Sequence, residues 1–280
     1  MKIYSLLQKN IPLLQERGLK KEEAENEIRL ILAHLLKIPP LKVYFYEGEL
    51  PEDLIKRFQD ILENRLKGIP LAYLLGETEF FGYRFFISSG ALIPRPETEI
   101  LVEAVLETLT CRPAHLCELG VGSGVISLTL ALECPDFRLF GVELSPAALK
   151  VACKNRRYWH LEERVFFIRG NWLEPFKKGP FFAAIVSNPP YIAPEEWPEL
   201  PSEVRDYEPK EALLAEENGL AFIRRTLEQA PDYLCPGGYV FLEIGYNQAT
   251  LVSSLAKELG YQISFKRDFL GFKRVLVAKK

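Results

Sequence analysis

An α/β fold with a mostly parallel sheet, preceded by a small helical bundle, is what the sequence predicts. Two features of the chain lead to this prediction. From Glu97 onward, apolar strand patterns alternate with helical patterns, an order typical of a parallel sheet covered by helices on both faces. Residues 1–66 show helical periodicity instead. The chain has 280 residues, 48% of them apolar and 26% charged, which suffices for two domains with separate cores.

The first part of the chain predicts three amphipathic helices. Apolar residues recur at helical spacing from Ile3 to Leu14, from Glu22 to Lys37 and from Glu52 to Leu66. Pro39-Pro40 ends the second of these patterns, because proline cannot continue a helix. We therefore expect residues 1–75 to form a helical bundle.

A short aromatic segment follows the expected bundle. Residues Glu79–Ser88 are mostly aromatic or β-branched, with Gly82 placed to make a turn, which predicts a β-hairpin. We expect residues 76–92 to connect the bundle to an α/β domain of residues 93–280.

The α/β domain should contain at least seven strands, two of them near the C-terminus. The other five are expected at Ala114–Leu119, Arg138–Glu143, Val165–Arg169, Ala183–Ser187 and Tyr239–Ile244. Long-range repeats and low-complexity segments are absent from the sequence. In an open parallel sheet, ligands bind at the carboxyl edge, so the residues that follow these strands are the candidate site.

Composition excludes several classes of protein. The net charge is −3, which does not favour a general nucleic-acid binder. The five cysteines are odd in number and lack C-x-x-C spacing, so we expect reduced, mostly buried thiols, and the three scattered histidines predict no metal site. The N-terminus lacks a signal-peptide core, and no apolar run approaches the roughly 18 residues of a membrane helix. A soluble, cytoplasmic protein is expected.

A glycine-rich turn follows the first expected strand of the α/β domain. It reads Glu118-Leu-Gly120-Val121-Gly122-Ser123-Gly124 and precedes a helical pattern. Glycines there allow sharp turns and close approach of a ligand to the main chain. Because short motifs have real false-positive rates, a turn without any ligand is also compatible with this segment alone.

Two further strand ends strengthen the prediction of a nucleotide-type ligand. Glu143 ends the next strand, about 20 residues after the glycines, where such a site places an acid for ribose hydroxyls. Asn171 and Trp172 follow the third strand, and an amide and an indole there can meet a purine edge and face. Taken alone, Glu143 is also compatible with a strand-end carboxylate that only faces water, and for Trp172 alone an ordinary, partly buried aromatic residue is the favoured interpretation.

The most specific feature is Asn188-Pro189-Pro190-Tyr191, directly after the fourth strand. Two prolines fix the backbone and donate no hydrogen bonds. They leave the Asn188 side-chain oxygen and the Pro189 carbonyl as two aimed acceptors, which suits a planar –NH2 group with two hydrogens. Tyr191 can cover the face of the same group. A rigid loop that only turns the chain is the less favoured interpretation, because this loop lies at the same sheet edge as the glycine turn.

Together these motifs resemble the class I S-adenosylmethionine-dependent methyltransferases, and more closely the HemK/PrmC family of release factor glutamine methyltransferases. The resemblance covers nearly the whole chain, and a Pro-Arg-Pro-Glu-Thr-Glu stretch ahead of the glycine turn is its most specific part. Its segments are Pro70–Gly76, Phe80–Gly82, Leu92–Glu99, Gly120–Gly124, Ser187–Ile192, Glu208-Pro209, Ala212-Leu213, Pro236–Gly238, Glu243–Gly245 and Gln248. Asn171 departs from the Asp of some members, and Asn218-Gly219 from the usual Asp-Gly.

The resemblance implies a Rossmann-like fold with a seven-stranded sheet, S-adenosylmethionine as methyl donor, S-adenosylhomocysteine as product, and no metal. It implies that the helical bundle contacts a release factor and that the Gly-Gly-Gln glutamine of that factor is methylated. The implied cofactor residues are Glu118, Gly120, Val121, Gly122, Ser123, Gly124, Glu143, Asn171, Trp172 and Asn188. The implied substrate residues are Arg95, Glu97, Asn188, Pro189, Pro190 and Tyr191, of which Asn188, Pro189 and Tyr191 are taken as catalytic.

Two other functions remain open at this stage. Adenine N6 or another exocyclic amine is also planar, so the same loop suits a nucleic-acid amino-methyltransferase. A binding module that retains the fold without catalysis is the second. The near-neutral charge disfavours the first, and the intact glycine turn and Asn-Pro-Pro-Tyr loop disfavour the second. We expect no direct contact with nucleic acid or membrane.

Overall fold

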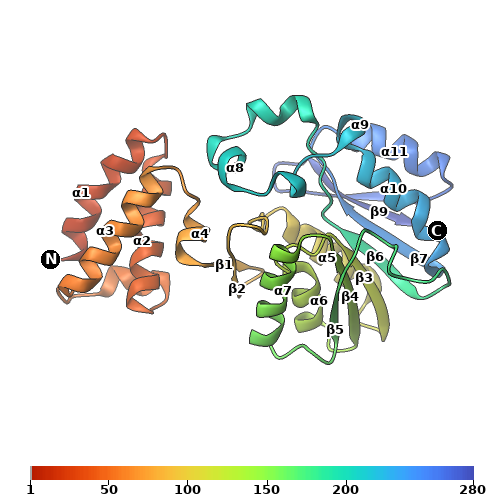
Figure 1. The fold of residues 1–280 in the computed structure, drawn as a ribbon, viewed down its shortest axis with the longest axis horizontal. Coiled ribbons are helices and arrows are strands. Elements are labelled where there is room, and N and C mark those ends of the chain that lie inside the picture. Colours follow the sequence, from red (N-terminus) through yellow and green to blue (C-terminus); the bar gives the residue numbers. More distant parts are fainter. Residues whose placement is uncertain (1) are drawn as a thin grey trace. The chain divides into compact units, whose positions relative to one another are not determined.

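The protein, analysed as a computed structural model that describes residues 2–280, divides into two compact units (Figure 1). The smaller unit holds the residues up to Gly76 together with Ser202–Tyr207. The larger unit holds Glu77–Pro201 and Glu208–Lys280. Within residues 2–280, no helix is both long and apolar enough to cross a bilayer.

The smaller unit is a helical bundle, and the three predicted helices are present within one or two residues of their expected bounds. Its elements are α1 (Ile3–Glu16), α2 (Lys21–Leu36), the 3-10 helix η1 (Pro40–Phe45), α3 (Glu52–Leu66), α4 (Leu71–Leu75) and α8 (Ser202–Tyr207). The helices pack their apolar faces together, so that Leu14, Ile28 and Phe58 are almost fully buried. Burial of this shared core stabilises helices that would be marginal alone.

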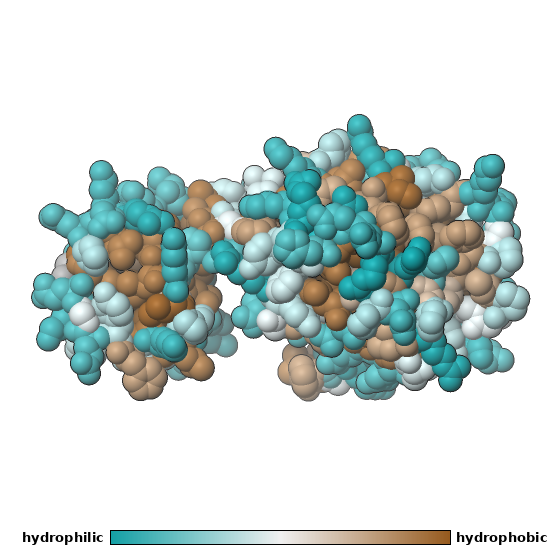
Figure 2. Space-filling view, turned by 90° about the horizontal axis from the view of Figure 1, so that it is seen from below, coloured by the Kyte–Doolittle hydropathy of each residue, from teal (hydrophilic) through white to brown (hydrophobic). Residues whose placement is uncertain are grey.

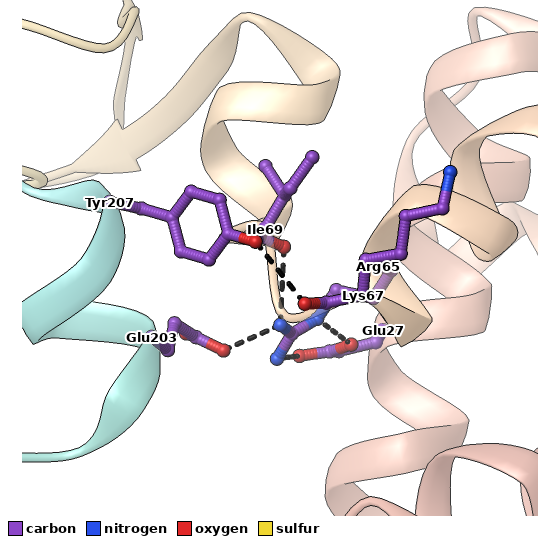
Figure 3. A network of polar contacts seen from close by, with 6 residues as sticks. All are labelled: Glu27, Arg65, Lys67, Ile69, Glu203 and Tyr207. Carbon is purple, nitrogen blue, oxygen red and sulfur yellow. Dashed lines mark hydrogen bonds and ion pairs between the residues drawn. The ribbon is translucent and has the colours of Figure 1, made fainter.

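Helix α8 joins this unit through a polar network around Arg65 (Figure 3). Two guanidinium nitrogens of Arg65 donate to the two carboxylate oxygens of Glu27, at 2.7 and 2.9 Å. Arg65 Nη1 also pairs with Glu203 Oε2 at 2.5 Å, and the Tyr207 hydroxyl donates to the Lys67 carbonyl at 3.2 Å. Since Arg65 is buried, this bidentate pairing satisfies a charge that would otherwise be costly.

A seven-stranded sheet forms the centre of the larger unit, in the order β5-β4-β3-β6-β7-β9-β8. Its strands are β3 (Ala114–Leu119), β4 (Phe137–Glu143), β5 (Val165–Arg169), β6 (Phe182–Ser187), β7 (Leu234–Glu243), β8 (Gln262–Arg267) and β9 (Lys273–Lys279). All neighbouring pairs from β5 to β7 are parallel, and β9 runs antiparallel to β7 and β8. The predicted α/β class and mostly parallel sheet are confirmed.

Helices cover both faces of this sheet (Figure 1). The longer ones are α5 (Thr98–Leu109), α6 (Val125–Glu133), α7 (Pro146–Tyr158), α10 (Ala221–Gln229) and α11 (Ala249–Glu258). Short turns of helix lie at η2 (Pro194–Glu199), η3 (Lys210–Ala212), α9 (Glu216–Gly219) and η4 (Ala230–Asp232). Successive β3 side chains point to opposite faces, so Leu116 enters the core with α5 and α6 while Cys117 enters the core with α10 and α11.

The aromatic segment after the bundle is a hairpin of β1 (Glu77–Phe80) and β2 (Tyr83–Phe86), as predicted. Its two-residue turn places Phe81 at φ 54° and Gly82 at φ 74°, the left-handed pair that a tight hairpin requires. Phe80 and Phe85 are buried in the core that includes α5 and α6. The hairpin is thus packed as part of the larger unit.

All five cysteines are free thiols, in agreement with the expectation of reduced cysteines. The expectation that most are buried is wrong. Cys117 and Cys134 are buried, Cys153 and Cys235 are half-buried, and Cys111 is exposed. Burial raises the pKa of the Cys117 thiol well above its ordinary value, which keeps that side chain neutral and apolar in character.

Candidate active site

The carboxyl ends of β3, β4 and β6 meet where the order of strands reverses. β3 and β6 are neighbours, but the chain leads from β3 to β4 on one side and from β6 to β7 on the other, so the two connections diverge and open a crevice. A cavity of about 340 Å3 fills this crevice. Most predicted cofactor residues line it, together with residues before α5. The lining includes Leu92, Pro94, Arg95, Thr98, Gly120, Val121, Gly122, Ser123, Glu143, Leu144, Gly170, Asn171, Trp172, Asn188, Pro190 and Phe222.

The glycine turn presents bare backbone to this cavity. Gly120 and Gly122 have φ of 73° and 58°, in the left-handed region that side chains with a Cβ disfavour. A Cβ at either position would meet no atom within 4 Å. Conformation rather than crowding therefore requires glycine here, and the open space beside the turn leaves a ligand room to approach the main chain.

Glu143 is held by the backbone on both carboxylate oxygens. Oε2 accepts from Gly122 N and Oε1 from Ser145 N, each at 2.8 Å. Each oxygen keeps a second lone pair, and the side chain lines the cavity. The geometry gives a fixed, charged acceptor at the end of β4, the arrangement that the spacing from the glycine turn predicts.

Two predicted cofactor residues, Glu118 and Gly124, do not line the cavity. Glu118 is buried, and its Oε2 accepts from the backbone nitrogen of Ser127 at 3.0 Å and from the Ser127 hydroxyl. Burial raises the pKa of Glu118 to about 8, while the Ser127 hydrogen bonds act in the opposite direction. Glu118 therefore ties β3 to α6. Gly124 is the N-cap residue of α6. A Cβ at this position would lie 3.2 Å from side-chain atoms of Ala152, Leu128 and Phe167.

Asn171 reaches the cavity with its amide already oriented. Arg225 Nη1 donates to Asn171 Oδ1 at 3.0 Å, and Asn171 Nδ2 donates to Glu174 Oε1 at 2.7 Å. One hydrogen and one lone pair of the amide remain for a ligand. Both the amide orientation and the position on the wall fit the predicted contact with a purine edge.

Trp172 is a buried part of the same wall. Its backbone lies at φ 56°, and its indole N–H donates to Thr226 Oγ1 at 3.0 Å. The ring packs against Phe222, with centroids 5.0 Å apart. Since the polar atom of the indole is satisfied by the protein, the ring offers the cavity an apolar surface only.

Asn188 follows the last residue of β6, and Thr98 fixes its orientation. Asn188 Nδ2 donates to Thr98 Oγ1 at 3.1 Å. The Thr98 hydroxyl also lowers the pKa of the nearby Glu243 carboxyl. This hydrogen bond uses the Asn188 amide nitrogen and leaves Oδ1 available to accept from a ligand. Among residues 2–280, no group donates to Asn188 Oδ1 or to the Pro189 carbonyl.

A second, smaller cavity of about 30 Å3 is also lined by this loop. Asn188, Leu92 and Arg95 line both cavities, whereas Pro189 and Tyr191 line only the small one. Asn188 is thus part of the wall shared by the two spaces.

Tyr191, the last residue of the Asn-Pro-Pro-Tyr loop, is half-buried and contacts the buried Glu243 at the end of β7. The Tyr191 hydroxyl donates to Glu243 Oε1 at 3.4 Å, and Glu243 Oε2 has no hydrogen-bond partner among residues 2–280. Burial raises the pKa of Glu243 to about 7, opposed by the Thr98 hydroxyl and by the charge of Arg274. Burial, reinforced by the charge of Glu243, also raises the pKa of Tyr191 far above its ordinary value. Tyr191 therefore stays neutral at physiological pH.

Gln248 holds the backbone of the Asn-Pro-Pro-Tyr loop through its side-chain amide. Its Nε2 donates to the Tyr191 carbonyl at 2.9 Å, and its Oε1 accepts from Gly245 N at 2.9 Å. Gln248 is buried, so these bonds are sheltered from water. The bonds link the loop to the start of α11 and hold Tyr191 in place.

Arg95 lines both cavities but is already paired. Its Nη2 donates to Glu208 Oε1 at 2.6 Å, and Glu208 Oε2 accepts from Ile93 N at 3.2 Å. The Glu208 side chain is only 1% exposed, so it fixes the segment before α5. Glu97, also predicted to contact substrate, lines neither cavity. It lies close enough to Tyr191 and Glu243 for its charge to raise the pKa of both.

Comparison with known proteins agrees with this geometry. Residues 5–76 match the PrmC N-terminal domain, and residues 96–199 match the methyltransferase small domain. The release factor glutamine methyltransferase of Aquifex aeolicus is 37% identical over 266 residues, which cover 94% of each chain. That of Vibrio cholerae is 38% identical over 268 residues, 95% of this chain and 92% of the other. The chain belongs to the release factor glutamine methyltransferase family.

Solved structures share the fold of this methyltransferase at low sequence identity. A methyltransferase from Pyrococcus furiosus aligns with a TM-score of 0.56 and 19% identity, over 78% of this chain and 98% of the other. The hMettl16 catalytic domain in complex with MAT2A 3′UTR hairpin 6 aligns with a TM-score of 0.58 and 17% identity, over 78% and 81%. The class I methyltransferase fold that the motifs imply is confirmed.

The sequence motifs indicate no role for four polar residues of the methyltransferase site: Thr98, Glu208, Glu243 and Gln248. All four lie in segments that carry the family resemblance, but none follows a glycine turn or a proline pair. Glu243 had a usable signal, because it ends a strand of the sheet as Glu143 does. Thr98, Glu208 and Gln248 act through side chains brought in from other segments, which one sequence does not reveal.

Proposed function

We propose that this methyltransferase transfers a methyl group from S-adenosylmethionine to the side-chain amide nitrogen of the glutamine in the Gly-Gly-Gln segment of a peptide chain release factor. The observation that carries the proposal is a pair of acceptors without donors: Asn188 Oδ1, from a residue that lines both cavities, and the carbonyl of Pro189, which lines the smaller one. A primary amide has two N–H hydrogens in one plane, which match two acceptors. The release factor glutamine methyltransferases that the chain resembles supply the substrate class.

The larger cavity suits the methyl donor. Glu143 would accept hydrogen bonds from ribose hydroxyls, and the backbone of Gly120 and Gly122 would approach the ligand closely. Asn171 and the face of Trp172 would contact the adenine. When bound, S-adenosylmethionine supplies an electrophilic methyl group on a sulfonium sulfur. At about 340 Å3, the cavity lies within the range of about 300–1,000 Å3 for small-molecule sites.

The two acceptors would act on the transition state. An amide nitrogen is a weak nucleophile, because its lone pair is delocalised into the carbonyl. As the nitrogen forms its bond to carbon it becomes more positive, and its hydrogens bind Asn188 Oδ1 and the Pro189 carbonyl more tightly than before. Stabilisation that grows during the reaction raises the rate, and holding the nitrogen in line with the methyl group adds to it. One amide proton then leaves to water, so no residue needs to act as a general base.

The smaller unit would serve as a second contact for the release factor. Transfer of a methyl group does not need this unit, because both cavities are lined by residues of the larger unit alone. In Figure 2 apolar side chains reach the surface of both units among hydrophilic ones. On the smaller unit Leu41 and Phe45 are 70% and 81% exposed. Contacts remote from the reacting amide can raise affinity for a large substrate.

The test is a labelling experiment with competing substrates. The full chain and labelled S-adenosylmethionine are incubated with intact release factor, with the same factor carrying alanine for the Gly-Gly-Gln glutamine, with free glutamine, and with DNA and RNA. Label is expected on the intact factor alone, at the glutamine nitrogen. Label in nucleic acid would support the exocyclic-amine alternative, and equal label on both release factors would place the acceptor elsewhere.

A further inference from the structure

The turn between β8 and β9 carries the most exposed large apolar side chains of residues 2–280. Phe269 and Leu270 are 106% and 82% exposed, and Phe272 is also exposed. Tyr246, 61% exposed, lies beside them, with its ring centroid 5.9 Å from that of Phe272. We call Tyr246, Phe269, Leu270 and Phe272 the apolar tip.

The protein itself fixes the conformation of this turn. The Asp268 carboxylate accepts from Leu270 N at 3.0 Å and from Phe272 N at 2.8 Å, and Arg274 Nε donates to it at 2.8 Å. Arg274 and these backbone groups lower the pKa of Asp268, so it is charged at neutral pH. The aromatic and leucine side chains thus project from an ordered turn, which lowers the entropy that a binding partner must overcome.

The apolar tip lies at the same sheet edge as the Asn188 loop. β9 runs antiparallel to β7, with Val275 opposite Glu243, so the turn continues past the carboxyl end of β7. Ile244 N donates to the Arg274 carbonyl at 2.8 Å. The Arg274 side chain is near enough to lower the pKa of both Tyr191 and Glu243 by its charge. Arg274 therefore pairs with Asp268 in the turn and also lies near Tyr191 and Glu243.

We infer that the apolar tip is a docking surface for the release factor, on the part of its surface that surrounds the acceptor glutamine. The inference rests on the proposed function, since a glutamine presented by a folded protein brings that protein's surface to this edge. Aromatic residues on rigid supports are the residues that dominate protein interfaces. Exposed apolar groups beside a substrate site lose their contact with water only when a partner covers them.

A membrane is the other partner that exposed phenylalanine and leucine fit, and the charges around the turn disfavour it. Membrane-binding tips rely on free basic side chains beside the apolar ones. Here Arg267 donates to the Gly271 carbonyl at 2.5 Å, Arg274 pairs with Asp268, and Lys266 pairs with Glu107. These three basic side chains are thus bonded within the protein, and the ammonium of the fourth nearby one, Lys273, lies 4.8 Å from the centre of the Phe265 ring.

The decisive variant is Phe269→Ser with Leu270→Ser in the full chain. Neither side chain lines a cavity or belongs to the hydrophobic core, so the fold and the reaction should be unaffected. We expect KM for intact release factor to rise about tenfold or more, the scale of a hot-spot truncation, and directly measured affinity for the factor to fall equally. Turnover at saturation, KM for S-adenosylmethionine and activity on a short Gly-Gly-Gln peptide should remain at wild-type values.

The matched control is Phe181→Ser, which removes a 55% exposed ring just before β6, at the opposite edge of the sheet. It should leave affinity for the release factor unchanged. Unchanged affinity of the double variant would overturn the inference, as would equal losses on peptide and factor. Anionic vesicles that bind wild type and not the double variant would also overturn it if affinity for the factor were unchanged. Failure of the proposed function is distinct, because wild type would then not methylate the factor at all.

Discussion

At the carboxyl edge of the sheet, the hydrogen-bond acceptors at the end of β4 already have donors, whereas those at the end of β6 have none among residues 2–280. At the end of β4, both oxygens of Glu143 already accept backbone N–H groups. At the end of β6, Asn188 Oδ1 and the Pro189 carbonyl accept none from residues 2–280. A satisfied acceptor is held in place before any ligand arrives, so it contributes mainly to binding. An acceptor without a donor gains its hydrogen bond only with the substrate, and it gains most as charge develops.

The largest expected effect on activity comes from the end of β6, where the acceptors have no donors. Asn188→Ala should lower kcat by about 10²–10³-fold, the range for removing one aimed group from a developing charge. Melting temperature should stay close to that of wild type, since Asn188 is only half-buried. Methyl transfer to intact release factor under saturating substrates measures the effect.

Asn171→Ala is the matched control, because Asn171 also follows a strand but is held by Arg225 and Glu174. It should raise KM for S-adenosylmethionine more than it lowers kcat. Wild-type turnover by Asn188→Ala would remove the proposed role of the acceptor pair, and similar losses in both variants would erase the difference between acceptors with and without donors.

The next largest effect is expected at the end of β4, where both oxygens of Glu143 accept hydrogen bonds. Glu143→Ala should weaken binding of S-adenosylhomocysteine by roughly 1.5–3 kcal/mol, the contribution of hydrogen bonds to a charged acceptor. The loss includes a looser turn, since Gly122 N and Ser145 N lose their partner. Calorimetry gives the affinity, and Glu143→Gln should lose less because it retains one acceptor oxygen. Unchanged affinity in Glu143→Ala would refute the ribose contact.

A smaller effect is expected from the group that orients the acceptor. Thr98→Val keeps the shape of the side chain but leaves Asn188 Nδ2 without its 3.1 Å acceptor. Loss of one buried hydrogen bond, about 1–1.5 kcal/mol, corresponds to roughly a tenfold lower kcat. Thr98→Ser should restore turnover, and neither variant should alter KM for S-adenosylmethionine much. Loss in both variants would indicate a packing role for Thr98 instead.

The fold and the strand-end residues of the site were open to prediction because they depend on local pattern. Strand periodicity placed β3 and β5 at their observed bounds, and strand-end rules placed Glu143 and Asn188 on the cavity wall. Glu118, which the family resemblance implied as a cofactor residue, does not line the cavity. It is the residue before the last of β3, and its side chain turns toward Ser127 in α6 rather than toward the cavity.

What the sequence could not reveal depends on contacts between distant segments. Asn188 and Thr98 are 90 positions apart, and Arg95 and Glu208 are 113 apart. The grouping of Ser202–Tyr207 with the helical bundle is of the same kind, since its charged partner Arg65 lies in α3. Periodicity reports which face of an element is buried, but not which other element covers it.

The last prediction, with the smallest expected effect on activity, concerns Glu118. This third carboxyl near a strand end has one oxygen with a donor and one without. Its Oε2 is bonded by Ser127, and its Oε1 has no partner among residues 2–280. Burial raises its folded-state pKa from 4.5 to about 8. Between these pH values the unfolded chain releases a proton that the folded chain retains, so the free energy of unfolding falls as pH rises, and Glu243, with a pKa of about 7, adds to the same trend.

Glu118→Gln is uncharged at every pH and can still accept from Ser127. We expect the melting temperature of wild type to fall from pH 5 to pH 8 and that of the variant to fall less, with the variant more stable at pH 8 by roughly 1–3 kcal/mol. Turnover should change by less than about twofold, since Glu118 lines neither cavity. Parallel pH curves for the two proteins would contradict the raised pKa. A large loss of cofactor affinity would instead move Glu118 into the class of Glu143, as a group that holds the ligand.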